Sequence, residues 1–247
     1  MTKNEKELIY NLLKSADANL YGYTRDKFST TPDFSDDEQI LSAEKQINAQ
    51  TEILEKHNDG NSGLKLNELN EKIIRCTRCG LARTRTNVVP GQGVENPKVL
   101  VIGEGPGYEE DQQGLPFVGK AGHLLDKMLA AIDLSRSTNC YIANIVKCRP
   151  PENRDPFPDE QASCMSFLEA QIHILKPKMI LCMGRISGNK LLNLEKPMNE
   201  LHGEVFDYNG IPLMVTYHPS ALLRNEDLKV PAWHDLKKFK QALEQMQ

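Results

Sequence analysis

The stretch KVLVIG, residues 98–103, decides the fold class of this 247-residue chain. It is an unbroken apolar run that ends in glycine, which is typical of a strand buried on both faces of a parallel sheet. Two further runs share this pattern and a predicted hairpin follows them: CYIANIV (140–146), KMILCMG (178–184), and VFDYNG with IPLMVTYH (205–218). Helices with one apolar face are expected around these strands, at 119–132, at 159–176, up to Leu192 and at 231–246. The alternation predicts an α/β fold with three α/β/α layers around a mostly parallel sheet.

The composition changes on the N-terminal side of this pattern. Residues 1–70 carry 8 Lys and Arg against 13 Asp and Glu, whereas residues 71–247 carry the remaining 22 and 21. The acidity behind the formal net charge of −4 therefore belongs to the N-terminal stretch. We expect residues 1–70 to be a polar extension of unknown role, with helices at 3–20 and 37–56 and a linker at 57–63, and residues 71–247 to be the functional domain.

The sequence disfavours a membrane protein. No apolar run approaches the roughly 20 residues of a spanning helix, and the first residues, MTKNEKELIY, lack the apolar segment of a secretory signal. We therefore expect a cytoplasmic protein that has no membrane partner. Hydrophobic residues make up 39% of the chain, which is enough for a buried core. Because a near-neutral domain can gather its cations on one face, the charge balance leaves DNA open as a partner.

The six cysteines fall into two groups. Cys140 and Cys182 lie within apolar strand patterns, and we expect them to be small buried residues. The other four surround the first and second strands: Cys76 and Cys79, a C-x2-C pair, then Cys148 after the second strand and Cys164 in the next helix. In a cytosolic protein this set predicts a metal or cluster site rather than disulfides. The spacing leaves zinc and an iron–sulfur cluster both open.

Loops at the predicted strand ends carry the candidate ligand-binding residues, since ligands bind beyond the carboxyl ends of parallel strands. GEGPGYEED (103–111) is neither G-x-G-x-x-G nor a P-loop, which disfavours a nucleotide cofactor. Phe117 lies in GLPFVGKAG (114–122), where a core anchor and a stacking residue are equally expected. Asn144 and His218 end the second and the last strand, and Leu222, Leu223 and Arg224 are expected on the loop after His218. Together these loops predict one shared site.

The motifs taken together resemble one known family. GEGPGYEED, GLPFVGKAG, NIVKCRPPENRDP (144–156), HPSALLR (218–224) and the four cysteines are similar to family 4, iron–sulfur-type uracil-DNA glycosylases over about residues 71–247. The resemblance implies a monofunctional hydrolase of base excision repair that flips uracil out of DNA and cleaves its N-glycosidic bond, leaving an abasic site. It also implies a central four-stranded, mostly parallel sheet and a 4Fe–4S cluster on Cys76, Cys79, Cys148 and Cys164.

The resemblance further implies roles for single residues. Phe117 stacks on uracil, Asn144 hydrogen-bonds the polar edge of uracil, and His218 stabilises negative charge on its O2. The other implied positions are the main chain of Glu104 and Gly105 along the pocket, Glu110 and Asn153 supporting the site, and Leu222 or Leu223 with Arg224 entering the minor groove. Gly105 stands where other uracil-DNA glycosylases carry Asp or Asn, so no general base is assigned. Uracil-containing DNA is the expected partner, and a monomer the expected state.

Two alternatives stay open. The first is a non-catalytic, metal-stabilised nucleic-acid-binding module, which the cysteines favour and which Asn144 and His218 at strand ends oppose. The second concerns the arginines around the first cysteine pair, which are equally expected as phosphate contacts and as solvated surface residues: Arg75, Arg78, Arg83 and Arg85.

Overall fold

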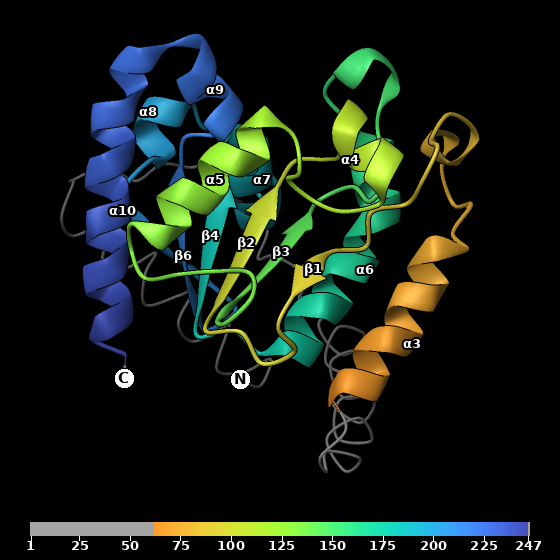
Figure 1. Cartoon of the computed structure of the whole chain (residues 1–247), viewed down its shortest axis with the longest axis horizontal. Coiled ribbons are helices and arrows are strands. Elements are labelled where there is room, and N and C mark those ends of the chain that lie inside the picture. Colours follow the sequence, from red (N-terminus) through yellow and green to blue (C-terminus); the bar gives the residue numbers. More distant parts are fainter. Residues whose placement is uncertain (1–61, 247) are drawn as a thin grey trace, which may run out of the picture. The chain divides into compact units, whose positions relative to one another are not determined.

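The computed structural model describes residues 62–246, and these contain one six-stranded sheet (Figure 1). The strands are β1 (Gln92–Gly93), β2 (Val99–Gly103), β3 (Cys140–Asn144), β4 (Met179–Met183), β5 (Val205–Tyr208) and β6 (Ile211–Thr216), in the order β1-β3-β2-β4-β6-β5. Strands β3, β2, β4 and β6 are parallel to one another, whereas the edge strands β1 and β5 are antiparallel to their neighbours. Four parallel strands and the hairpin are confirmed, and β6, the second strand of the hairpin, is the fourth parallel strand. The expected strand count of four was wrong, because β1 and β5 each add an antiparallel strand at an edge.

Helices of unequal length connect and cover the strands. The longer ones are α3 (Ser62–Ile74), α5 (Lys120–Ala130), α6 (Pro158–Leu175), α7 (Arg185–Leu192) and α10 (Lys229–Glu244). The shorter ones are α4 (Tyr108–Gln113), α8 (Met198–Leu201), α9 (Pro219–Arg224) and the 3-10 turns η1 (Gly80–Arg83), η2 (Pro151–Asn153) and η3 (Glu226–Leu228). Among the described residues, no helix is both long and apolar enough to cross a bilayer.

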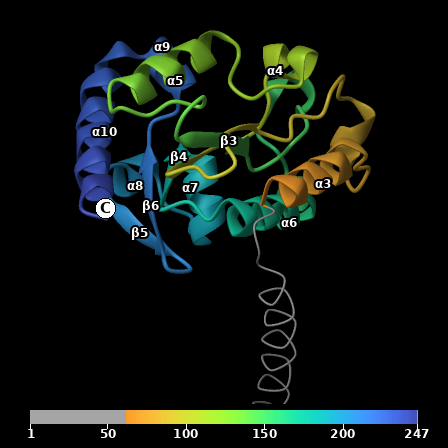
Figure 2. The ribbon, with the colours of Figure 1, turned by 60° about the horizontal axis from the view of Figure 1, so that its bottom comes forward.

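The apolar strand residues build two cores, one on each face of the sheet. In β2, Leu100 and Ile102 pack with residues of α3, α6, α7 and α8, whereas Val99 and Val101 pack with residues of α5, α9 and α10. All four side chains are fully buried, as the unbroken apolar run predicts for a strand covered on both faces. Figure 2 shows the two helical layers on opposite sides of the strands, which gives the expected three-layer α/β/α architecture.

Helix α3 extends the compact unit beyond the expected domain. That unit begins at Asn61, and α3 runs without a break across the expected boundary between residues 70 and 71. Leu66 and Ile73 on α3 are buried and belong to the same core as α6. Residues 62–70 therefore lie in the same compact unit as the sheet. The helices expected at 3–20 and 37–56, and most of the expected linker, lie outside the described residues.

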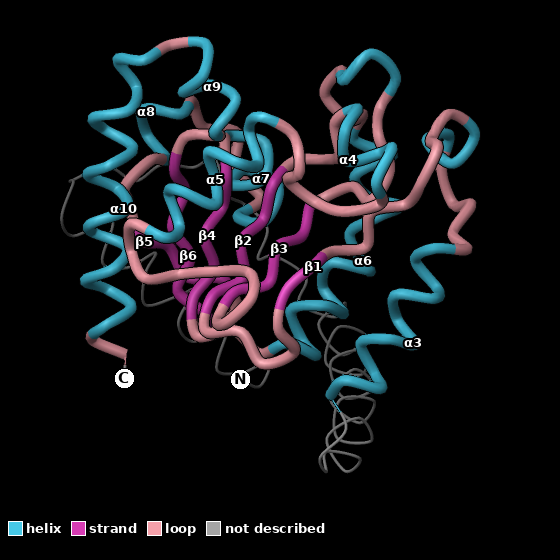
Figure 3. Tube along the Cα trace, in the orientation of Figure 1, coloured by secondary structure: helices cyan, strands magenta, loops and turns pink. Residues whose placement is uncertain are grey.

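Two expected loops contain short helices. Leu222, Leu223 and Arg224, expected on a loop, form the end of α9, and Pro219 begins that helix. Proline is well tolerated there because its missing N–H would have no intrahelical partner. In the glycine-rich loop after β2, α4 begins at Tyr108. Figure 3 shows the carboxyl ends of the parallel strands at one edge of the sheet, where each strand runs into a loop.

Candidate functional site

A cavity of about 550 Å³ lies beyond the carboxyl ends of the parallel strands. It brings together all the residues predicted to line or support the base pocket: Glu104, Gly105, Glu110, Phe117, Asn144, Asn153 and His218. Arg224, predicted to enter the minor groove, also lines it. Their positions span from residue 104 to residue 224, so only the fold unites them. The volume is in the range of small-molecule sites, and a single nucleobase fits within it.

Asn144 supplies an amide that has no partner for its oxygen. The residue is 2% exposed, and its Oδ1 is buried without a hydrogen bond among the described residues. A buried amide oxygen left unpaired is costly, which points to a ligand group that completes it. Gly103 makes room for this amide, because an added Cβ there would overlap Asn144 Oδ1 and lie 2.7 Å from the Phe117 ring. The amide is thus fixed with its oxygen ready to accept.

Phe117 is both a buried residue and a wall of the cavity. Its side chain is 6% exposed, and its ring centroid lies 5.6 Å from that of His218 with a tilt of 34°. The ring therefore packs in the core and also lines the cavity, whereas its stacking on a base stays a prediction. Its backbone has a positive φ of 52°.

His218 has its tautomer set by the turn that starts α9. The Ser220 N–H donates to His218 Nδ1 at 3.1 Å, and Ser220 Oγ lies 2.8 Å from the same atom. Burial, with a smaller contribution from Arg224, lowers the pKa of His218 to about 4. A neutral ring that accepts at Nδ1 carries its proton on Nε2. The free edge of His218 is therefore a hydrogen-bond donor that has no formal charge.

Glu110 and Asn153 support the cavity from different loops. Glu110 Oε1 accepts from the N–H groups of Val118 (2.8 Å) and Gly119 (3.0 Å), and its Oε2 accepts from Gly107. One carboxylate thus ties the glycine-rich loop to the loop that carries Phe117. Asn153 is exposed and accepts from Arg149 Nε at 2.7 Å. At the cavity wall, Glu110 is thus held by backbone N–H groups and Asn153 by the Arg149 side chain.

The end of α9 divides the residues expected to enter DNA. Leu222 is 3% exposed and belongs to the core, so its side chain is not available at the surface. Leu223 is 50% exposed, and Arg224 is exposed beside the cavity. Of the two leucines, only Leu223 is placed to contact a partner.

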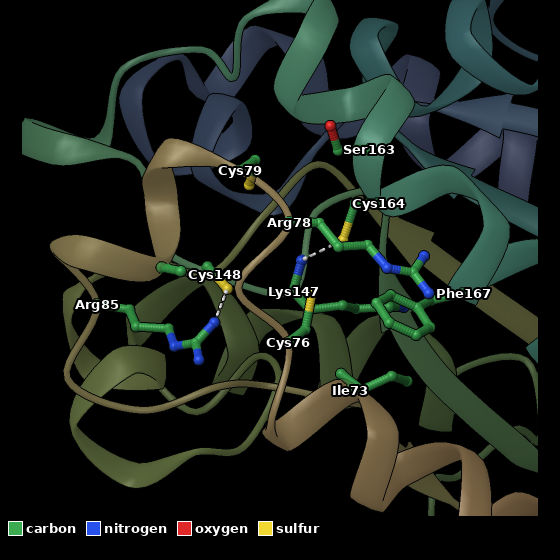
Figure 4. Close-up of a pocket in the computed structure, with 11 residues that line it drawn as sticks. Ile73, Cys76, Arg78, Cys79, Arg85, Lys147, Cys148, Ser163, Cys164 and Phe167 are labelled. Atoms are coloured by element: carbon green, nitrogen blue, oxygen red, sulfur yellow. Dashed lines mark hydrogen bonds between the residues drawn. The ribbon is translucent and has the colours of Figure 1, made fainter.

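A second cavity gathers the four predicted cysteines (Figure 4). Cys76 follows α3, Cys79 precedes η1, Cys148 follows β3 and Cys164 lies on α6. None of them forms a disulfide. Burial raises the pKa of Cys148 to about 11, so it is a neutral thiol unless a ligand displaces its proton. Cys140 and Cys182 are fully buried in strands and lie outside this cavity, as expected.

Hydrogen-bond donors reach two of the four sulfurs. Arg85 Nη1 donates to Cys148 Sγ at 3.1 Å, and the Lys147 N–H donates to Cys164 Sγ at 3.4 Å. Arg78 lines the same cavity and stacks over Phe167 at 4.2 Å. Arg75 instead lies 3.7 Å from Glu71 on the surface, and Arg83 is exposed. Of the four arginines flagged in the sequence, Arg78 and Arg85 line the cysteine cavity, and Arg85 donates to a cysteine sulfur.

The comparisons with known proteins agree with this geometry. Residues 90–245 match the model of the uracil DNA glycosylase superfamily. The type-4 uracil-DNA glycosylase of Thermotoga maritima is 42% identical over 176 residues, which cover 70% of this chain and 91% of the relative. Those of Pyrobaculum aerophilum and Archaeoglobus fulgidus are 41% and 38% identical over 182 residues each, covering 70% of this chain and 92% and 91% of the relatives. The chain belongs to the type-4 uracil-DNA glycosylase family.

Two residues of this type-4 chain have side-chain contacts that the sequence analysis did not predict. The Glu104 side chain lines the cavity, and its pKa is raised to about 7, first by burial and then by Asp155, while Arg185 opposes the rise. Lys147 is 1% exposed and donates to the Asn144 carbonyl (2.9 Å) and to Gln171 Oε1 (2.6 Å). Its position beside Cys148 in the sequence is the one signal that could have found it.

Proposed function

We propose that this protein hydrolyses the N-glycosidic bond of uracil in DNA and leaves an abasic site. The observation that carries the proposal is the buried Asn144 amide, whose oxygen has no partner among the described residues and which lines a base-sized cavity with Phe117 and His218. An amide fixed in this way is suited to read the edge of one pyrimidine.

The Asn144 amide can separate uracil from cytosine by hydrogen-bond polarity. Uracil presents an N3–H donor beside its O4 acceptor, whereas cytosine presents an N3 acceptor beside an N4 donor. Asn144 Oδ1 accepts from N3–H and its amide N–H donates to O4, so uracil satisfies both groups. Cytosine would leave both unpaired in a buried site, which costs about 1–3 kcal/mol for each group.

His218 fits the role of stabilising the leaving group. When the bond between C1′ and N1 breaks, its electron pair stays on uracil and charge gathers on O2. The Nε2–H of a neutral His218 is free to donate to that oxygen, since Nδ1 is occupied by Ser220. A preorganised donor of this kind contributes about 3–4 kcal/mol to catalysis. Water then adds to C1′ of the sugar, and the proton that it releases balances the protonation of the uracil anion.

The surroundings of the cavity suit a flipped nucleotide. Phe117 offers a buried ring for stacking, and α9 presents Leu223 and Arg224 at the surface. An apolar wedge in the vacated base stack and a cation near the phosphates are the usual means of holding flipped DNA. No lysine lines the described part of the cavity, which favours simple hydrolysis over an amine nucleophile. We further propose that one chain suffices, since the pocket is built from a single chain.

The cysteine cavity supports the proposal of a 4Fe–4S cluster on Cys76, Cys79, Cys148 and Cys164. Within residues 62–246, no three His, Cys, Asp or Glu side chains come close enough together to share a single metal ion. A cubane cluster makes no such demand, because each of its four irons takes one thiolate. When bound, the cluster would cross-link three chain segments: the turn between α3 and η1, the loop after β3, and α6.

The charges around the cysteines fit an anionic group. The Lys147 ammonium is buried against two neutral acceptors, and no carboxylate pairs with it among the described residues. A buried cation without a counter-ion is strongly unfavourable. Four thiolates on a cluster would supply the missing negative charge, and Arg85 already donates to one of these sulfurs.

One assay tests the function. The purified protein is incubated with oligonucleotides that contain a single uracil or cytosine, and alkali then cleaves any abasic sites. We expect strand cleavage with uracil and none with cytosine. DNA binding without cleavage would identify the non-catalytic module instead. Iron analysis of the same protein, made with ample iron, tests the cluster: about four irons per chain are expected, and stoichiometric zinc would contradict it.

A further inference from the structure

We infer that Arg136 is a positioning residue that holds Phe117 in the conformation in which its ring stacks on uracil. The inference rests on the stacking role proposed for Phe117. Arg136 lies in DLSRSTNC (133–140), the turn before β3, and no motif marks it. Its side chain is 16% exposed, and its contacts reach β1, α5 and the Phe117 loop.

Phe117 needs external support because its backbone is strained. A φ of 52° is unfavourable for a residue with a Cβ, and such residues persist only where their surroundings hold them. A relaxed loop would turn the ring away from its position 5.6 Å from the His218 ring. The stacking wall of the cavity therefore depends on contacts that fix this one residue.

Arg136 hydrogen-bonds to both peptide groups that flank the Phe117 Cα. Its Nη1 donates to the Pro116 carbonyl at 2.7 Å, and its Nη2 donates to the Phe117 carbonyl at 2.9 Å. These carbonyls belong to the peptide groups before and after Phe117. Holding both planes fixes φ and ψ together. On the far side of the second plane, the Val118 N–H donates to Glu110, so that peptide is held at both ends.

All N–H groups of the Arg136 guanidinium donate hydrogen bonds. Nε and Nη2 donate to Asp126 Oδ1 at 3.0 and 2.8 Å, and Nη1 donates to Gln92 Oε1 at 3.0 Å. With the two carbonyl contacts, the five N–H groups make five hydrogen bonds. A lysine has one nitrogen and cannot reproduce this planar arrangement. The contacts to Asp126 and Gln92 orient the guanidinium, and those to the carbonyls act on Phe117.

Gly122 on α5 packs against the Phe117 carbonyl group. A Cβ at Gly122 would overlap the Phe117 carbonyl carbon and oxygen, so helix and loop are packed without spare room. The carbonyl therefore has a defined direction, and Arg136 lies in that direction. Loss of the guanidinium would free the loop where the base must stack.

The test is a double-mutant cycle between Arg136→Gln and Phe117→Ala, read by single-turnover uracil excision. We expect Arg136→Gln alone to lower the rate about ten- to a hundredfold, because small misplacements of positioning groups have effects of this size. In the Phe117→Ala background, Arg136→Gln should cause no further loss, since its effect passes through that ring. Equal losses in both backgrounds would overturn the inference.

Three further measurements separate positioning from general stability. Inhibition by free uracil should weaken in Arg136→Gln and Arg136→Lys, whereas iron content and affinity for uracil-free DNA should stay at the wild-type level. Asp126→Asn is the matched control, because it removes the ion pair and leaves the donors to both carbonyls; its excision rate should stay within about threefold of wild type. If Arg136→Gln loses iron or affinity for uracil-free DNA together with excision, Arg136 serves the fold and the inference fails. Absence of uracil excision by the wild-type protein would instead overturn the proposed function.

Discussion

At the residue scale, His218 combines a low pKa with a defined tautomer. Its pKa of about 4 keeps the ring neutral throughout the physiological range, and Ser220 occupies Nδ1. We predict that His218→Ala slows single-turnover excision at least about a hundredfold, because the donor to the leaving group is lost. Affinity for uncleaved DNA should change little, since the charge on O2 develops only as the bond breaks.

Excision by the wild-type enzyme should also show no acid limb near pH 6.5, the usual pKa of histidine, because His218 stays neutral well below that pH. The rate is measured from pH 5 to pH 8 in cluster-replete protein. A folded His218→Ala variant that excises uracil at the wild-type rate would remove His218 from the leaving-group role.

The pKa of Glu104 is raised, whereas that of His218 is lowered. Burial and Asp155 raise the pKa of Glu104 from 4.5 to about 7. Between pH 4.5 and pH 7 the folded state therefore keeps a proton that the unfolded state has lost. The free energy of unfolding therefore falls as the pH rises from 4.5 through 7. We predict that Glu104→Gln removes this loss and is about 2 kcal/mol more stable than wild type at pH 8, but equal to it near pH 4.5.

The measurement is guanidinium unfolding of both proteins at pH 4.5 and pH 8. A pH-independent difference between the two would mean that the carboxyl does not titrate as the cavity geometry implies.

The sequence could predict the residues at the strand ends, and the reason is geometric. Asn144 and His218 follow parallel strands, whose carboxyl ends must meet at one edge of the sheet. Arg136 and the Glu104 carboxylate could not be predicted. Their environments come from residues distant in sequence, such as Asp155 for Glu104 and Gln92 for Arg136, and no local pattern encodes these contacts.

At the scale of the elements, β3 links the two cavities of the molecule. It ends at Asn144 in the base pocket, and the chain reaches Cys148 in the cysteine cavity four residues later. Between them, the Lys147 ammonium donates to the Asn144 carbonyl, and the Lys147 N–H donates to Cys164. The end of this strand is thus held by the same residue that faces the proposed cluster.

We predict that Lys147→Met releases iron faster than wild type when the protein is challenged with a chelator. Methionine fills a similar volume but removes the buried positive charge that would balance the thiolates of the proposed cluster. The readouts are visible absorbance and iron per chain over time. Cys182→Ala is the control, since Cys182 is buried in β4 outside the cysteine cavity, and should retain iron as wild type does. Equal release from Lys147→Met and wild type would contradict the charge argument.

Regular strands and long helices could be predicted from periodicity, whereas the short elements could not. Helix α9 has six residues, too few to show a helical repeat, and its sequence starts with proline. Its assignment as a loop was wrong because the Ser220 contacts to His218, not periodicity, start the helix. The same helix buries Leu222 and exposes Leu223, a distinction that needs the packing against α5 and α10.

At the scale of the whole molecule, the residues of both cavities lie within the compact unit that begins at Asn61. The composition of the sequence placed a boundary near residue 70, because residues 62–70 are as polar as those before them. Leu66 is nevertheless buried in the same core as α6, so α3 belongs to the compact unit, because one apolar face is enough to attach a helix to a core. A truncation must therefore keep α3 intact.

We predict that deleting residues 1–60 leaves uracil excision within about twofold of the full chain, whereas deleting residues 1–74 impairs folding and iron content. The first deletion removes no residue of either cavity, and the second removes α3, whose Leu66 and Ile73 lie in the core beside α6 and which leads directly to Cys76. Excision rate, iron per chain and thermal midpoint are compared among the two truncated proteins and the full chain. If the protein lacking residues 1–60 stayed folded and iron-replete but excised uracil at less than a tenth of the full rate, the N-terminal extension would have a part in catalysis or DNA binding that neither cavity explains.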